Sequence, residues 1–517
     1  DHRDLHSFPT RRSSDLKEIL VNLVDYYTLR NEHNLNIQWY AFSRINALAA
    51  YDWIYNDLTE RERTEIGKPL LHAISDMPST DRGSVFRKNY GDIKTGFYGP
   101  PCLPWYAGIV FFKTGIDDSL SMALLQKGYD DHTALLKYRS EISGDDGGAA
   151  SAVLGYCMGA YPWAEYNFFH SFSSATGLDL AQEWSYVPQF INYIFWNWLP
   201  GDRQFGYGDA NHRDNDLPLR YLHIHLSQMI HFYGKTQPEL IALAKWMQTK
   251  VHRQQQGVFP LTRFLLTNTF DEIKPEGPSE ILTRARHFEN MGQLFMRSGS
   301  GPDDTYALFM AGGILTQHRH YDNNNFVIFK KGFLTLDTGT RPQPGLHLSH
   351  YYARTVAHNC ITIKMPGEIM PGYWDSGPAL SEKEVPVYPN DGGQNNMMGS
   401  EIIAFDEKEQ YVYIASDATA SYHSDKAKLV LRQFVFLPPD HFVILDRVCS
   451  TKTEYKKRWL LHTAAEPTIK NDEFYTDHWG GRLFCKTLYP ENAELKKIVG
   501  PGKQFWSDGR NWALPEL

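Results

Sequence analysis

Three histidines and one aspartate lie close together in the second half of the sequence. His318 and His320 are separated by one residue, Asp337 follows seventeen residues after His320, and His358 lies in the segment AHN. In an extended strand residues i and i+2 share a face, so the first two imidazoles would project together. Imidazoles and a carboxylate suit zinc, and manganese with lower affinity. The spacing predicts a divalent metal site, with ordinary surface or core histidines as the alternative interpretation.

The segments around these residues predict strands that would bring the side chains together. Asp337 ends the run FVIFKKGFLTLD, in which a turn at Lys331 and Gly332 separates two alternating stretches. That turn would fold Asp337 back beside His320. His358 would arrive from a third strand, HNCITIKM. We therefore expect the candidate ligands on neighbouring strands of one sheet.

The whole C-terminal part, residues 286–517, alternates apolar and polar residues between short turns. Examples are TYALFMAGG, EIIAFDEKEQYVYIASDAT and LVLRQFVFLPPDHFVILDRV. This period of two predicts an antiparallel β-sandwich. The chain stops at DGRNWALPEL without an evident closing strand, which indicates a truncated C-terminus.

Residues 17–285 have a helical pattern instead. Apolar residues recur at spacings of three and four in segments such as IQWYAFSRINALAAYDWIYNDL and LPLRYLHIHLSQMIHFYG. Thr59 and Glu62 form a capping box that predicts a helix start. Short turns separate the segments, so we expect an (α/α) helical toroid ahead of the sandwich. Residues 1–16 have the composition of a vector-derived leader, and we expect them to lie outside the fold.

Length, charge and cysteine usage exclude several classes of protein. At 517 residues the chain is long enough for at least two hydrophobic cores. The net charge of −8 argues against a nucleic-acid-binding protein. No apolar run reaches the ~18 residues that a membrane helix needs, so we expect no membrane insertion. The five cysteines are widely spaced and indicate neither a disulfide framework nor a thiolate metal site.

The histidine segment also carries a family resemblance. Its sequence, HRHYDNNNFVIFKKGFLTLDTGT followed by YYARTVAHN, with the preceding MGQLFMRSGSGPDDTYALFMAGG, resembles the heparinase II/III-like polysaccharide lyases. The likeness is sharpest over residues 291–363 and extends over nearly the whole chain after Lys17. It implies a toroid followed by a β-sandwich, and a periplasmic or secreted enzyme that acts on an anionic polysaccharide. A homodimer is a possible assembly of such an enzyme.

The resemblance assigns roles to the clustered residues. His320, Asp337 and His358 match the family's metal ligands, and His318 matches the histidine that faces the substrate. The metal, zinc or manganese, would order loops below the cleft and have a mainly structural role. The reaction implied is β-elimination on a uronic-acid polysaccharide, a glycosaminoglycan or alginate, which yields an unsaturated uronate.

Such a reaction needs a base that removes the C5 proton and an acid that protonates the leaving oxygen. The family places a tyrosine for this in a toroid helix after a turn rich in Asp and Gly. In SGDDGGAASAVLGYCMGAYPWAEY that position matches Tyr156, with Tyr161 as the second candidate. The family's toroid Asn-His pair has no counterpart in KTGFYGPPCLPWYAG. The sequence therefore does not determine which residue is the base or which polysaccharide is the substrate.

Further polar groups are candidates for binding an anionic sugar. The loop FGYGDANHRDND contains Asn211, His212 and Arg213, and an arginine fits a carboxylate or sulfate with two hydrogen bonds. A solvated turn is the alternative interpretation of this loop. Arginines near the histidine cluster would add positive charge to the cleft: Arg319, Arg341 and Arg354.

Three other functions compete with the lyase. A toroid glycoside hydrolase would use a pair of carboxylates, and the candidates are Asp145, Asp146, Glu165 and Asp209. A metal oxygenase of the cupin type would explain the His-x-His pair but not the helical half. A polysaccharide-binding protein without activity would explain the missing Asn-His pair.

Overall fold

The structure is a computed structural model of the 517-residue chain. It describes the following residues: 9–35, 42–75, 103–144, 147–148, 162–201, 203–204, 222–251, 266–278, 283–315, 318–339, 347–373 and 388–513. No helix among them is long and apolar enough to cross a membrane.

The chain divides into two compact units, which are described separately here. The first comprises Asp1–Ser140, Ala160–Trp184 and Val258–Leu265. The second comprises Glu141–Gly159, Ser185–Gly257 and Leu266–Leu517.

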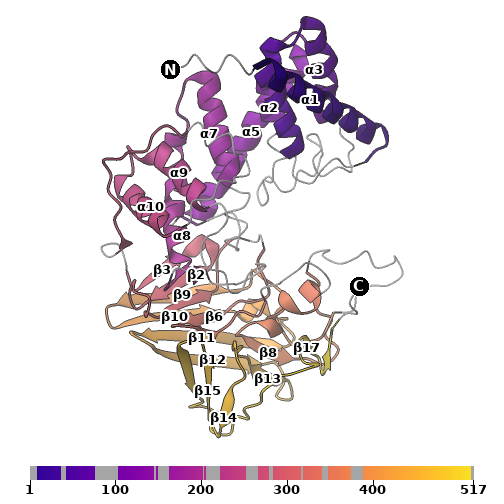
Figure 1. The fold of residues 1–517 in the computed structure, drawn as a ribbon. Coiled ribbons are helices and arrows are strands. Elements are labelled where there is room, and N and C mark those ends of the chain that lie inside the picture. The colour runs from indigo at the N-terminus through magenta and orange to yellow at the C-terminus, as the bar shows by residue number, and fades with distance from the viewer. Residues whose placement is uncertain are drawn as a thin grey trace. The chain divides into compact units, whose positions relative to one another are not determined.

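The first unit is built from α-helices (Figure 1). Its helices are α1 (Pro9–Glu32), α2 (Phe42–Ile54), α3 (Glu60–Ser75), α4 (Leu103–Val110), α5 (Asp118–Ser143, whose last residues belong to the second unit) and α7 (Pro162–Thr176). Apolar residues spaced by one helical turn pack into a common core; Leu20 and Val24 of α1 lie in it with Leu70 and Leu71 of α3. The helices of this unit therefore form in the part of the sequence where the apolar spacing predicts helices.

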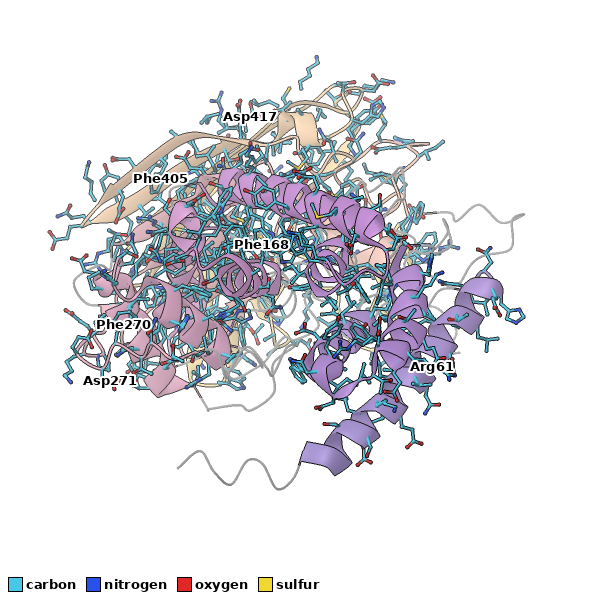
Figure 2. The ribbon with its side chains drawn as sticks, turned by 90° about the horizontal axis from the view of Figure 1, so that it is seen from above. Arg61, Phe168, Phe270, Asp271, Phe405 and Asp417 are labelled. Carbon is cyan, nitrogen blue, oxygen red and sulfur yellow. The ribbon has the colours of Figure 1, made fainter. Side chains whose placement is uncertain are left out.

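The predicted capping box opens α3. The Glu62 backbone N–H donates to the Thr59 hydroxyl at 3.3 Å, and the Thr59 backbone N–H donates to the Glu62 carboxylate at 2.9 Å. Two N–H groups that the helix cannot satisfy internally are thus paired. Deeper in this unit the His132 ring stacks on Phe168 of α7, labelled in Figure 2, with ring centroids 4.2 Å apart.

Among the described residues, the second unit contains three complete α-helices and all the strands. The helices are α8 (Tyr186–Trp196), α9 (Leu222–Tyr233) and α10 (Pro238–Lys250). The strands are β1 (Trp198–Leu199), β2 (Arg203–Gln204), β3 (Ala285–Phe288), β4 (Gln293–Arg297), β5 (Tyr306–Met310), β6 (Asn325–Phe329), β7 (Phe333–Thr335), β8 (Ile361–Lys364), β9 (Glu401–Lys408), β10 (Tyr411–Asp417), β11 (Ala427–Leu437), β12 (His441–Ser450), β13 (Lys456–Trp459), β14 (Thr468–Lys470), β15 (Glu473–His478), β16 (Gly481–Lys486), β17 (Trp506–Ser507) and β18 (Arg510–Asn511).

Two antiparallel sheets form the sandwich. One has the order β3-β4-β5-β6-β7 and the other β12-β11-β10-β9; Figure 1 shows β9 to β12 side by side. Side chains from both sheets share one core, in which Phe309 and Phe326 meet Phe434 at ring distances of 5.5 and 5.4 Å. Smaller sheets, β13-β8 and β14-β15-β16, extend this framework.

Arg297 joins the end of α8 to the first sheet. This buried side chain of β4 donates to the Phe195 carbonyl at 3.0 Å and to the Trp198 carbonyl. The last carbonyls of a helix have no partner within it, so a cation placed there stabilises the helix end. Burial lowers the pKa of Arg297 to about 10, which still leaves it charged near neutral pH.

The predicted order of the fold is confirmed: helices come first and antiparallel sheets follow. Two boundaries differ from the expectation. Helix α1 begins at Pro9, so residues 9–16 are helical although we expected residues 1–16 to lie outside the fold. The division into compact units does not fall at residue 285, because α8, α9 and α10 belong to the unit that contains the sandwich. The domain limits of 17–285 and 286–517 stay a prediction.

Candidate metal centre and active site

Three buried side chains converge at one point beside the five-stranded sheet. Asp322, Asp337 and His358 each offer one ligand atom, and these atoms lie within 4.8 Å of one another. The side chains are almost fully buried, with exposures of 4%, 1% and 0%. Buried carboxylates are costly unless a positive charge or a metal ion balances them. The cluster is therefore the strongest candidate metal site among the described residues.

Local backbone structure explains why these three residues meet. Asp322 begins a tight turn in which the Asn325 N–H donates to the Asp322 carbonyl at 2.9 Å, and β6 starts at Asn325. Asp337 follows the end of β7, the strand that pairs with β6. His358 follows a short 3-10 helix, Thr355–Ala357, just before β8. Each ligand thus sits at a strand end, where the backbone leaves the sheet.

The electrostatics of the cluster favour a cation. Burial raises the pKa of the Asp322 carboxyl, and the nearby Asp337 carboxylate adds to this effect. Burial alone would lower the pKa of His358, but the carboxylates of Asp337 and Asp322 raise it above its usual value. A proton on His358 supplies one positive charge to the two carboxylates, and a divalent cation supplies two.

The donor atoms also fit a metal ion. Nδ1 of His358 lies 2.9 Å from Oδ1 of Asp337, yet neither ring nitrogen of His358 has an aligned hydrogen-bond partner among the described residues. Two carboxylate oxygens and one imidazole nitrogen suit zinc or manganese. We conclude that an ion of this kind would be held by Asp322, Asp337 and His358.

A glycine makes room for the histidine ligand. The Gly339 N–H donates to Oδ1 of Asp337 at 2.8 Å. A Cβ atom at residue 339 would overlap the His358 ring and would lie 2.6 Å from the Tyr352 carbonyl oxygen. A side chain at this position would therefore displace His358.

His320, which the resemblance assigns to the metal, lies beside this cluster. Its ring centroid is 5.4 Å from that of His358 and 5.3 Å from that of Tyr373, and its side chain is buried. The group of converging ligand atoms contains Asp322 and does not include His320. Its role as a ligand therefore stays a prediction.

The expectation that His318 and His320 share the face of one strand is wrong. Residues 318–320 lie outside the strands, and His318 has a φ of 57°, in the left-handed region. A backbone that turns at His318 cannot keep the alternation of a strand. The His318 side chain is buried, with 2% exposure.

The two described arginines near the cluster are both buried. Arg319 donates to the Asn323 side chain at 2.7 Å, and burial lowers the pKa of its guanidinium. Arg354 forms an ion pair with Asp391 at 2.8 Å and donates to the carbonyls of Pro371 and Pro389. The expectation that Arg354 adds charge to a cleft is thus wrong, because its guanidinium is already bound within the fold.

Several predicted residues lie outside the described part of the chain. These are Tyr156, Tyr161, Asn211, His212 and Arg213, with Arg341 and the carboxylates Asp145, Asp146 and Asp209. Their roles stay predictions. Of the carboxylates proposed for a hydrolase, Glu165 is described, and it forms a buried ion pair with Arg139.

Sequence reasoning missed Asp322. The signal was available, since DNNN directly follows HRHY and a run of Asp and Asn before a strand typically forms a turn with polar side chains directed at the backbone.

The family model described as Heparinase II/III-like, C-terminal matches residues 280–493, which include the whole candidate metal centre. No curated protein matches the chain.

Solved structures with similar folds include two of the heparan sulfate lyase HepC from Pedobacter heparinus. The mutant form has 16% identity and a TM-score of 0.50, covering 88% of this chain and 66% of its own. The other form has 16% identity and a TM-score of 0.49, covering 86% and 62%. A heparinase III has 14% identity and a TM-score of 0.47, covering 73% and 49%. The chain thus spans between half and two thirds of these proteins, and the likeness shows the fold alone.

Proposed function

We propose that the protein is a polysaccharide lyase that cleaves a uronic-acid-containing polysaccharide by β-elimination, and the match of residues 280–493 to the family model described as Heparinase II/III-like, C-terminal supports this. The observation that carries the proposal is that the matched segment contains both the buried Asp322, Asp337 and His358 cluster and the neighbouring His318.

The reaction has three requirements. The C6 carboxylate of the uronate must be neutralised so that the C5 proton becomes acidic enough to leave. A base then removes that proton, and an acid protonates the departing C4 oxygen, which leaves a C4–C5 double bond. We assign His318 to proton transfer or to the substrate carboxylate, with Tyr156 as the partner group and Tyr161 as its alternative.

The metal centre has a supporting role in this proposal. When bound, the ion would neutralise the two carboxylates and hold three strand ends together. Asp322, Asp337 and His358 would bind it, with His320 as a further ligand. Because the His320 ring packs against His358 on one side and Tyr373 on another, the ion would also keep the His-x-His loop in place.

Heparan sulfate is the first substrate to test, because the HepC mutant, whose fold is similar, is described as a heparan sulfate lyase. Chondroitin sulfate, hyaluronan and alginate share the uronate on which the reaction depends. Such polymers are extracellular, so we also propose that the protein acts in the periplasm or outside the cell.

The test is a continuous assay of ultraviolet absorbance with each polymer separately, using zinc-loaded protein. An unsaturated uronate absorbs, whereas the product of hydrolysis does not, so a rise identifies β-elimination and names the substrate. His318→Ala should then abolish the rise. His441→Ala is the matched control, because His441 lies on the solvent-exposed start of β12.

Two outcomes would contradict the proposal. Reducing ends released without absorbance would establish a hydrolase. Binding of a polymer without any product would establish a binding protein. Full activity in His318→Ala would leave the lyase intact and would remove His318 from the reaction.

A further inference from the structure

One buried asparagine contacts all three segments that carry the candidate metal ligands. The backbone N–H of Asn325 donates to the Asp322 carbonyl at 2.9 Å. Its side-chain Nδ2 donates to Oδ2 of Asp337 at 3.3 Å. Its Oδ1 accepts the backbone N–H of Asn359, the residue after His358, at 2.9 Å.

The orientation of this side chain is determined by its partners. The Asn359 N–H can only donate, so the oxygen of the Asn325 amide must face it. That leaves the Asn325 NH₂ group directed at Asp337, where the carboxylate can only accept. Asn325 is completely buried, so water does not compete for either bond.

Asn359 continues the same framework on the other side. Its Nδ2 donates to the carbonyls of Phe326 and Leu336, at 2.6 and 2.9 Å. Its carbonyl accepts from Arg432 at 2.7 Å, and Arg432 is held in turn by two hydrogen bonds to Asp446. The segment that Asn325 contacts is therefore itself fixed to the sheets.

We propose that Asn325 is the positioning residue of the metal centre: it sets the carboxylate of Asp337 and the segment of His358 at the separation that an ion requires. The inference rests on the proposed metal site and is independent of the lyase activity. Groups that orient metal ligands typically change affinity 10–100-fold when removed.

The experiment is a titration of purified, metal-free protein with Zn²⁺ against a chromophoric chelator. Asn325→Ala removes both side-chain hydrogen bonds, and we expect the Zn²⁺ dissociation constant to rise by about tenfold or more. Asn324→Gly is the matched control. The Asn324 side chain has no hydrogen-bond partner among the described residues, and its φ of 67° suits glycine. This control should bind Zn²⁺ like the wild type.

Thermal unfolding separates positioning from a general loss of structure. A merely structural role would lower the Tm of metal-free and zinc-loaded Asn325→Ala equally, so the rise in Tm on adding Zn²⁺ would be unchanged. Positioning predicts a smaller rise, because the stabilisation by a bound ligand grows with the logarithm of its affinity.

If Asn325→Ala folds only with the ion bound, the rate of Zn²⁺ release into excess EDTA replaces the titration. Release faster than from the wild type supports the proposal. Wild-type affinity or wild-type release in Asn325→Ala overturns it. Wild-type protein that takes up neither Zn²⁺ nor Mn²⁺ overturns the metal site and this inference with it, whatever the lyase assay shows.

Discussion

At the scale of single residues, the central result is that Asp322, an aspartate outside the predicted set, converges with Asp337 and His358 at the candidate metal site. We expect Asp322→Ala to weaken Zn²⁺ binding by at least about tenfold, because it removes one of three converging ligand atoms and leaves His358 with one carboxylate. Equilibrium dialysis against a metal buffer measures this.

The control for that experiment is Asp440→Ala, a substitution at a partly exposed carboxylate that pairs with Lys330. It should bind the ion normally. Comparing Asp322→Ala with His320→Ala then decides the ligand set. If only His320→Ala lost the ion, the ligands assigned by family resemblance would be correct and Asp322 would be a neighbour.

A second residue-scale prediction concerns His132 in the helical unit. Burial lowers the pKa of this histidine to about 4, from 6.5, although its ring bonds to the Gly128 carbonyl. The unfolded chain therefore binds the proton first as pH falls, and stability is lost from pH 6.5 downward until the folded pKa is reached. Between about pH 7.5 and about pH 5 this group alone should cost the fold about 2 kcal/mol.

Urea unfolding of wild type and His132→Leu at both pH values tests this prediction. The difference between the two proteins isolates the histidine from other titrating groups. The variant should lose less stability than the wild type on acidification. An equal loss in both would show that His132 is protonated in the folded state.

The residues that sequence reasoning placed correctly and those it misplaced differ in one physical respect. Asp337 follows a regular strand, so periodicity located it. His318 and Asn324 both have left-handed backbone, and Asp322 lies in the turn between them. Sequence periods describe repeating backbone and carry no information on such a turn. Arg354 was misjudged because its partner, Asp391, lies far along the chain.

At the scale of elements, helix α3 shows how much local sequence decides. Thr59→Ala removes the hydroxyl that caps the Glu62 N–H, and we expect it to lower the free energy of unfolding by about 1 kcal/mol. Chemical denaturation measures the change.

Thr64→Ala is the control within the same helix. The Thr64 hydroxyl bonds back to the Glu60 carbonyl, and alanine has the higher helix propensity, so this change should be neutral or slightly stabilising. A loss at Thr64 equal to that at Thr59 would mean that both substitutions act through something other than the cap.

Elements were predictable where their signals are local. Helical spacing, the capping box and alternation gave the helices and the sheets of the sandwich. The π-helical turn at Leu348–Tyr352 and the 3-10 turn before His358 had no such signal, because tertiary contacts select them. One of the three candidate ligands, His358, directly follows the 3-10 turn.

At the scale of the whole molecule, the division into two compact units predicts two unfolding transitions. The metal centre belongs to the second unit, so EDTA should lower the temperature of one transition and leave the other unchanged. Differential scanning calorimetry with and without EDTA measures both. Added Zn²⁺ should restore the original profile.

His132→Leu identifies the other transition, because His132 lies in the first unit. It should move the transition that EDTA leaves unchanged. A single transition that shifts with both treatments would show that the units unfold together.

Gly339 has a consequence for recognising related proteins. Its missing side chain is what allows the His358 ring and the Asp337 carboxylate to approach each other. A sequence that keeps the aspartate and the histidine but replaces this glycine should be unable to hold an ion in this way. The glycine can therefore help to sort genome sequences. It separates those able to bind an ion here from those that keep the aspartate and the histidine without the space for His358.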